Sequence, residues 1–287
     1  MNEIEIPHEL FICPECKTKL TRANQKLTCP LCKKEVLQDG RFLDFSQLTP
    51  KLNLKFADYL SNLYIHAGTE QNDINDNWRI HKIIQKIPKK EIGSICLEIG
   101  GADGPLTPIL EDRYSIVFSI DLSKPFLKRI ETKTKKTFCI LGDAQFLPLI
   151  DNSVDVVVCS EVLEHVLIPT QLLLEIRRIL KPDGYCLLSV PNETNGIFPE
   201  DIKKNPITSS DAHVNFYSES HLKKLLFRMG FEICEMLKIG APINLKRLLF
   251  LPLIILRNGQ VYSHILTTIR PMKNPDIYWQ NLEKSLN

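Results

Sequence analysis

The chain has 287 residues, of which 44% are hydrophobic and 24% charged, a balance that excludes a disordered or fibrous protein and allows one sizeable α/β domain with a small accessory module. Its 36 basic and 34 acidic residues leave a formal charge of +2, so no chain-wide field favours a polyanion, and any contact with nucleic acid would have to be local. The most apolar stretch, 248–256, is interrupted by Pro252 and is too short for a transmembrane segment, which needs roughly 20 apolar residues.

The beginning of the chain, MNEIEIPHEL, has neither a basic leader nor an apolar core of the kind found in secretory signals. We therefore expect a cytoplasmic location. The cysteines of the later chain fall inside apolar runs, where a free cysteine behaves as a small buried hydrophobe, and their odd number argues against a complete disulfide framework. They are Cys96, Cys139, Cys159, Cys186 and Cys234.

Residues 1–48 contain two CPxC units, CPEC and CPLC, whose separation along the chain is close to that of paired metal-binding CxxC units. Their thiols are Cys13, Cys16, Cys29 and Cys32. Zinc prefers tetrahedral coordination by such soft ligands, and closing the site can fold a segment too small to build its own core. The sequence therefore predicts a zinc ribbon with a structural Zn²⁺. A redox dithiol is the alternative for a lone CxxC, and the ribbon could serve either as a structural cap or in substrate recognition.

Residues 49–92 join this ribbon to the next domain and have the apolar spacing of helices, the last ending near Pro88. This helical linker could cover a ligand cleft or pack on the edge of a sheet.

From residue 93 onward, short apolar runs alternate with helical stretches such as 170–180. The expected strands are 95–99, 116–120, 138–141, 154–159 and 185–190. Strands that alternate with helices form βαβ units, so the pattern predicts an α/β domain with a doubly wound, parallel sheet. Ligands of such sheets bind beyond the carboxyl ends of the strands.

A glycine-rich turn follows the first expected strand, in the order Glu98-Ile-Gly100-Gly101-Ala102-Asp103-Gly104. Its spacing does not match the GxGxxG fingerprint that admits a pyrophosphate. An acidic residue just before the glycines suits a ligand that carries positive charge.

Two further strands end in carboxylates. Asp121 closes the second strand about 20 residues after the glycine turn, where a carboxylate can accept both hydroxyls of a ribose. Asp143 follows the third strand, where it could accept a hydrogen bond from an exocyclic amine such as that of adenine, with Phe146 and Leu147 beside the ring. Each aspartate alone could be a helix cap, but their order after the glycine turn favours a nucleoside site.

At this point the chain resembles the class I S-adenosylmethionine-dependent methyltransferases, in particular the group of ubiquinone-biosynthesis type. The resemblance covers residues 93–272 and rests on ICLEIGGADG, VFSID, LGDAQFLPLIDNSVDVVVCSEVLEHV, LKPDGYCLLSVPN and HVNFYSESHLKKLLFRMGFE. It implies a Rossmann-like, seven-stranded, mostly parallel sheet with helices on both faces, whose last two strands, 231–239 and 261–270, are antiparallel.

The same resemblance implies that S-adenosylmethionine is the cofactor and which residues bind it. The methionine moiety would be flanked by the glycine turn, the ribose held by Asp121, the adenine recognised at 143–144, and the cleft lined at the fourth strand. The residues are Glu98, Gly100, Gly101, Gly104, Asp121, Asp143, Ala144, Ser160 and Glu161. One departure is Ala102, which stands where the family usually has a glycine.

An apolar insertion, 242–258, separates the last two strands, and the tail 273–287 is uninformative. The insertion could be a lid, a dimerisation surface, a platform for peripheral membrane contact or a packed core helix.

Methyl transfer from a sulfonium mainly requires alignment of the nucleophile, the methyl carbon and the sulfur. His213 and His165 lie where an acceptor should bind and are the candidate catalytic bases. Near-neutral charge and the apolar insertion favour an oxygen or nitrogen of a small metabolite, lipid or glycan precursor. The alternatives are a methyltransferase of rRNA or tRNA bases, suggested by the ribbon and the basic run 124–136, and a non-catalytic, methyltransferase-like binding module.

Overall fold

The structure of the protein is a computed structural model that describes residues 6–23, 26–49, 53, 55, 78–87, 93–192, 213–240 and 264–273. The insertion 242–258, most of the linker 49–92 and nearly all of the tail 273–287 lie outside these residues, so the expectations about them are untested. No helix in the described part of the chain is both long and apolar enough to span a bilayer.

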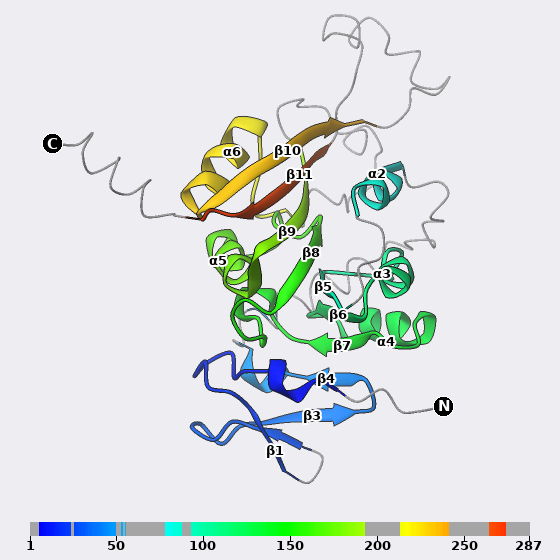
Figure 1. Ribbon diagram of the computed structural model, residues 1–287, viewed down its shortest axis with the longest axis vertical. Helices are drawn as coiled ribbons and strands as arrows, with labels where there is room; N and C mark the ends of the chain where they lie inside the picture. Colours follow the sequence, from blue (N-terminus) through cyan, green and yellow to red (C-terminus); the bar gives the residue numbers. More distant parts are fainter. Residues whose placement is uncertain are drawn as a thin grey trace, which may run out of the picture.

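A twisted sheet forms the centre of the α/β domain (Figure 1), with strand order β7-β6-β5-β8-β9-β11-β10. The strands from β7 to β9 are parallel, and β11 pairs antiparallel with both β9 and β10. The bounds are β5 (Ile95–Ile99), β6 (Ile116–Asp121), β7 (Phe138–Leu141), β8 (Val154–Ser160), β9 (Leu180–Pro191), β10 (Phe231–Ile239) and β11 (His264–Pro271). The predicted Rossmann-like sheet is thereby confirmed.

One strand is longer than the sequence indicated. Strand β9 begins at Leu180, which pairs with Val154, before a register shift leads into the expected stretch from Tyr185. The polar turn residues between Leu180 and Tyr185 hid this early pairing, since they look like a loop between two elements.

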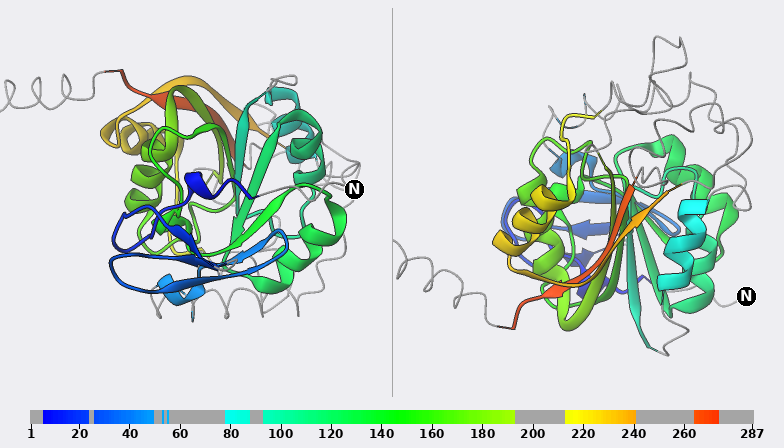
Figure 2. Two further views of the ribbon diagram at one scale, coloured as in Figure 1. Left: turned by 60° about the horizontal axis from the view of Figure 1, so that its bottom comes forward. Right: turned by 90° about the horizontal axis from the view of Figure 1, so that it is seen from above.

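Helices cover both faces of the sheet (Figure 2): α5 and α6 lie on one face, and α2, α3 and α4 on the other. Their bounds are α2 (Trp78–Lys86), α3 (Thr107–Arg113), α4 (Lys124–Lys133), α5 (Pro169–Ile179) and α6 (Glu219–Arg228), with the short 3₁₀ turns η1 (His8–Leu10), η2 (Ser46–Leu48) and η4 (Ala144–Phe146). Separate apolar clusters fill the two faces: α5 and α6 contribute to one, and α2 and α3 to the other.

The N-terminal segment 6–48, hereafter the ribbon, extends the central sheet. Its strands are β1 (Thr21–Ala23), β2 (Lys26–Thr28), β3 (Glu35–Asp39) and β4 (Phe42–Asp44). Strand β4 runs parallel to β7, so in the described part of the chain the four ribbon strands continue the expected seven-stranded sheet to 11 strands. The physical reason is that β7 ends the seven-stranded part and would expose unpaired backbone groups, which β4 satisfies.

Side chains reinforce this junction. Phe11 of the ribbon packs between Phe45 and Phe118, with ring centroids 5.9 and 5.6 Å apart. Arg41 donates to the carbonyl of Thr137 at 2.6 Å, just beyond the end of α4. The ribbon and one face of the α/β domain therefore share a single hydrophobic core.

Candidate active site

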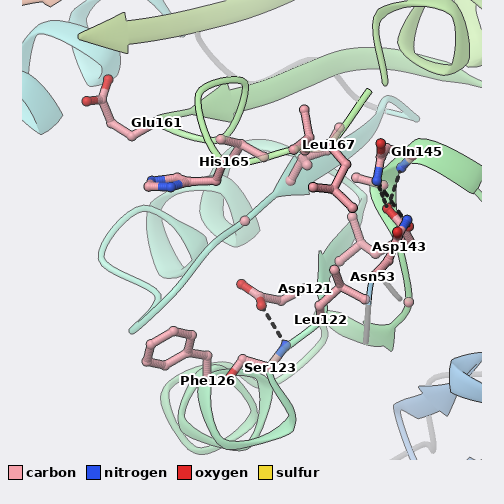
Figure 3. Close-up of a pocket in the computed structure, with 17 residues that line it drawn as sticks. Asn53, Asp121, Leu122, Ser123, Phe126, Asp143, Gln145, Glu161, His165 and Leu167 are labelled. Carbon is pink, nitrogen blue, oxygen red and sulfur yellow. Dashed lines mark hydrogen bonds between the residues drawn. The ribbon is translucent and has the colours of Figure 1, made fainter. Parts of the chain in front are cut away.

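A cavity of about 170 Å³ opens beyond the carboxyl ends of β5, β6, β7 and β8, where the topology places ligands. Figure 3 shows Glu161 and His165 at the upper left of the cavity, Asp143 at its right, and Asp121 below and between them. Of the predicted site residues, it brings together Gly100, Asp121, Asp143, Ala144, Glu161 and His165. Those that do not line it are Glu98, Gly101, Gly104, Ser160 and His213.

The glycine turn after β5 is shaped by close packing. Gly100 has a φ of +67°, and a Cβ added there would lie 2.4 Å from Cγ2 of Val162. A Cβ on Gly101 would lie 2.7 Å from Oε2 of Glu98. Both positions therefore exclude a side chain, which leaves the backbone of the turn against the cavity.

Glu98 lies beneath this turn and is buried. Its Oε2 accepts hydrogen bonds from Oγ1 of Thr107 at 2.6 Å and from Oγ of Ser119 at 3.1 Å. Burial raises its pKa to about 7, against the opposing effect of these two hydroxyls. Its observed contacts hold the turn in place, and its predicted contact with a methionine moiety stays a prediction.

Asp121 stands at the end of β6, with its side chain beside the cavity (Figure 3). Its Oδ1 accepts a hydrogen bond from the backbone N–H of Ser123 at 2.7 Å. Burial raises the pKa of Asp121 to about 6, although the N–H groups of Ser123, Ala102 and Leu122 act in the opposite direction. Its predicted contact with ribose hydroxyls stays a prediction.

Asp143 follows β7 and caps η4. Its Oδ1 accepts from the backbone N–H of Gln145 at 2.8 Å, and the side-chain amide of Gln145 lies 3.2 Å from each carboxylate oxygen. Asn53 donates a further, short hydrogen bond to Oδ2. Asp143 is thus a cap, as its position alone suggested, and it also lines the cavity. No local sequence signal marks Asn53, which also lines the cavity.

Glu161 begins the loop after β8 with a φ of +57°, a strained conformation for this residue type. Its carboxylate lies 3.0 Å from Nη1 of Arg79, 3.0 Å from Nε2 of His264 and 2.8 Å from Oγ of Ser189. Burial alone would raise its pKa, but these three groups outweigh it and lower the pKa to about 2. Glu161 is therefore an ionised anchor, and Ser160 supports it through a 2.9 Å contact with Ser189.

Sequence reasoning missed Arg79 and His264 because they come from α2 and β11, far along the chain, and only tertiary packing brings them to Glu161. An arginine on a linker helix and a histidine near the start of a strand carry no motif of their own.

His165, which lines the cavity, meets His213, which lies outside the lining, with ring centroids 4.9 Å apart in an edge-to-face arrangement. Burial lowers the pKa of His213 to about 4, with a further lowering from His165, so its imidazole is neutral at pH 7. The segment is held there because the backbone N–H groups of Val214 and Asn215 donate to the carbonyl of Glu164. The predicted catalytic roles of His165 and His213 remain predictions.

The basic run 124–136 is engaged within the molecule. Lys128 lies over the ring of Phe42, 4.6 Å from its centroid, and Arg129 pairs with Asp103. Lys136 donates to the carbonyl of Glu111 at 3.1 Å. These contacts favour a structural role of the helix α4 surface over a phosphate-binding one.

The four ribbon cysteines converge, with all Sγ atoms within 4.8 Å of one another. Both CxxC units have the same backbone conformation. The residue after each unit, Lys17 or Lys33, has a positive φ. Its backbone N–H donates to the carbonyl of the first cysteine of the unit. Sulfurs about 2.3 Å from a central zinc lie about 3.8 Å apart in a tetrahedron. The Cys13–Cys32 separation is 3.8 Å, so this arrangement fits a tetrahedral metal.

Residues 97–188, which carry the glycine turn and both aspartates, match the family described as a methyltransferase domain. This part of the chain is thus similar to methyltransferase domains. The chain is similar to a probable S-adenosylmethionine-dependent methyltransferase of Mycolicibacterium smegmatis, with 28% identity over 163 residues, 56% of this chain and 62% of that protein. It is also similar to a malonyl-[acyl-carrier protein] O-methyltransferase of Marinomonas, with 25% identity over 181 residues, 60% of this chain and 66% of that protein. The matches thus span less than two thirds of either relative.

Among solved structures, the methyltransferase domain is similar to a chain of the Haloferax volcanii complex between the Trm112 methyltransferase activator and its candidate methyltransferase. The TM-score is 0.59 at 21% identity, and the likeness covers 76% of this chain and 97% of that chain. At this identity the likeness supports the Rossmann-like α/β fold and nothing finer.

Proposed function

We propose that the protein is an S-adenosylmethionine-dependent methyltransferase of ubiquinone-biosynthesis type, which methylates an oxygen or nitrogen of a small metabolite, lipid or glycan precursor. The observation that carries this proposal is the single cavity shared by the glycine turn, Asp121 and Asp143. In this assignment Asp121 accepts the ribose hydroxyls, the backbone at 143–144 contacts the adenine, and the turn at Gly100 contacts the methionine end. Glu98 and Glu161 keep the two surrounding loops in place.

The proposed reaction is a direct displacement. A lone pair of the acceptor attacks the methyl carbon, the carbon–sulfur bond breaks with its electron pair staying on sulfur, and the sulfonium becomes a neutral thioether. An acceptor hydroxyl or protonated amine loses its proton in the process. The protein mainly supplies orientation, which can contribute roughly 7 to 11 kcal/mol, and Glu161 and His165 lie at the end of the cavity where the acceptor would enter.

Two observations support an acceptor other than RNA. Lys128 and Arg129 of α4, and Lys136 just beyond it, already have partners within the protein. Ile168 and Phe216 are exposed apolar side chains. Their two segments are joined by a 2.7 Å hydrogen bond from Asn215 Nδ2 to the carbonyl of Val166, which lines the cavity. Exposed apolar surface in these segments suits an acceptor with an apolar portion.

The four ribbon thiols would hold a structural Zn²⁺ that cross-links the two CxxC units. None of these thiols lines the cavity, so this ion would supply no redox or Lewis-acid chemistry there. Support comes from their tetrahedral spacing and from the shared core, which makes the ribbon a cover for the edge of the sheet. A reducing, cytoplasmic setting agrees with this thiolate site.

The test of the donor is titration calorimetry with S-adenosylmethionine. We expect micromolar binding to the wild type and loss of saturable heat in Asp121→Ala. Asp183→Ala, an exposed carboxylate on β9, is the matched control and should bind like the wild type. Absence of saturable heat in the wild type would leave the binding-module alternative standing.

The test of the acceptor is transfer of a radiolabelled methyl group to separated fractions of a cell extract. We expect label in the small-molecule or lipid fraction. Label that enters only the RNA fraction would overturn the proposed acceptor class.

A further inference from the structure

Three potential metal ligands outside the ribbon gather beside the cavity, and one of them, His165, lines it. They are Glu164, His165 and His213, and each offers a ligating atom such that all three atoms lie within 4.8 Å of one another. Glu164 and His165 come from the loop after β8, whereas His213 comes from the segment before α6. In the methyl transfer proposed above, none of these three residues binds S-adenosylmethionine.

The two segments are fixed relative to each other by backbone hydrogen bonds. The N–H groups of Val214 and Asn215 donate to the carbonyl of Glu164 at 2.9 and 3.0 Å. The hydroxyl of Tyr217 adds a bond of 3.3 Å to the carbonyl of Leu163. The cluster is therefore built on a fixed backbone, which is what a coordination site requires.

The spacing of the cluster agrees with coordination. Ligand atoms at about 2.1 Å from one cation can be at most about 4.2 Å apart. Oε1 of Glu164 and Nε2 of His165 are 3.7 Å apart, within this limit, and no two of the three ligand atoms are more than 4.8 Å apart. Nδ1 of His213 is buried and has no hydrogen-bond partner among the described residues, so it is available as a ligand.

We propose that Glu164, His165 and His213 bind a divalent first-row transition cation. Two imidazoles and a carboxylate form a harder donor set than the four thiolates of the ribbon, so the two sites would select different metals. The Glu164 carboxylate is almost fully buried. Because His165 lines the cavity, a cation that it binds would lie beside the space that an acceptor would fill.

This inference rests on the proposed function in one respect, the use of the cation. A hydroxyl oxygen of the acceptor would bind at an open coordination position, and its pKa would fall. Its proton passes to water, the oxygen takes the methyl carbon, and the sulfur keeps the electron pair of the broken bond. The site thus narrows the acceptor class from oxygen or nitrogen compounds to hydroxyl compounds.

The primary test uses the full chain, with its thiolate site first loaded with one equivalent of Zn²⁺, and Mn²⁺ as the probe. Loss of the free Mn²⁺ signal in electron paramagnetic resonance should show one bound equivalent. Pulsed measurements on the bound ion should detect coupling to two imidazole nitrogens, a signature that packing of two histidine rings does not produce. A wild type that binds no Mn²⁺, or binds it without nitrogen coupling, overturns the proposal.

Variants then assign the ligands. Glu164→Gln preserves the shape of the buried side chain, and His213→Gln removes one imidazole; each should weaken Mn²⁺ binding by at least about tenfold. His221→Gln is the matched control, because His221 lies on α6, packs near Tyr217 and is outside the cluster. If Glu164→Gln does not fold, the nitrogen coupling in His213→Gln, expected to fall from two nitrogens to one, decides alone. Wild-type affinity in both variants overturns the assignment.

Calorimetry with S-adenosylmethionine on the same samples separates the two proposals. Mn²⁺ binding without donor binding would retain the metal site and reject the methyltransferase function. Binding of S-adenosylmethionine without binding of Mn²⁺ would retain the methyltransferase function and reject the metal site.

Discussion

The raised pKa of Asp121 makes nucleoside binding depend on pH in a defined direction. Its ionised carboxylate accepts the ribose hydroxyls, whereas the protonated form loses much of that capacity. Because burial places its pKa at about 6, affinity should be full above pH 7 and should fall as the pH drops through 6. The ionised fraction is about 0.9 at pH 7 and about 0.1 at pH 5, so binding should weaken roughly tenfold, or about 1.4 kcal/mol.

The measurement is calorimetry between pH 5 and pH 8 with methylthioadenosine, which has the nucleoside and sulfur of the donor but no titrating amino-acid end. Asp121→Asn should bind about 10- to 100-fold more weakly at pH 7, since hydrogen bonds to charged groups contribute about 1.5 to 3 kcal/mol. The affinity of this variant should also be independent of pH across the range.

Glu98 is the necessary control, because burial raises its pKa to about 7 and it titrates in the same window. Glu98→Gln should keep the tenfold decrease between pH 7 and pH 5. The reasoning is refuted if Asp121→Asn retains the pH dependence, or if Glu98→Gln abolishes it.

Two further predictions concern stability. Ala102→Gly should raise stability by about 1 kcal/mol, or roughly 2 to 4 °C in Tm, because Ala102 has a φ of +46°, where an L side chain is strained; in differential scanning calorimetry Ala144→Gly, at an ordinary φ, should not show this gain. Cys29→Ser should lower the Tm by about 10 °C or more in one cooperative transition, because the zinc knuckles belong to the core shared with the α/β domain, whereas Cys234→Ser, at an exposed thiol, should have little effect. Two separate transitions, with the larger one unmoved, would contradict the shared core.

The sequence by itself determined the class of fold and the edge of the sheet where ligands bind. Each parallel strand brings the residue that follows it to the same edge, so a glycine turn after β5 and aspartates at the ends of β6 and β7 had to meet if the strands were identified correctly. The cavity that contains Gly100, Asp121 and Asp143 follows from that rule. The two CPxC units are equally local, since each closes its own knuckle through bonds within a few residues.

Only the tertiary structure decided how the ribbon joins the sheet and which groups surround Glu161. Strand β4 pairs with β7 through backbone groups that every residue carries, so no side-chain pattern announces the pairing. Arg79 and His264 reach Glu161 from segments far apart in the chain, and the position of His213 beside His165 depends on hydrogen bonds to a distant carbonyl. Long-range packing selects such neighbours, because the local sequence around each one is compatible with many other partners.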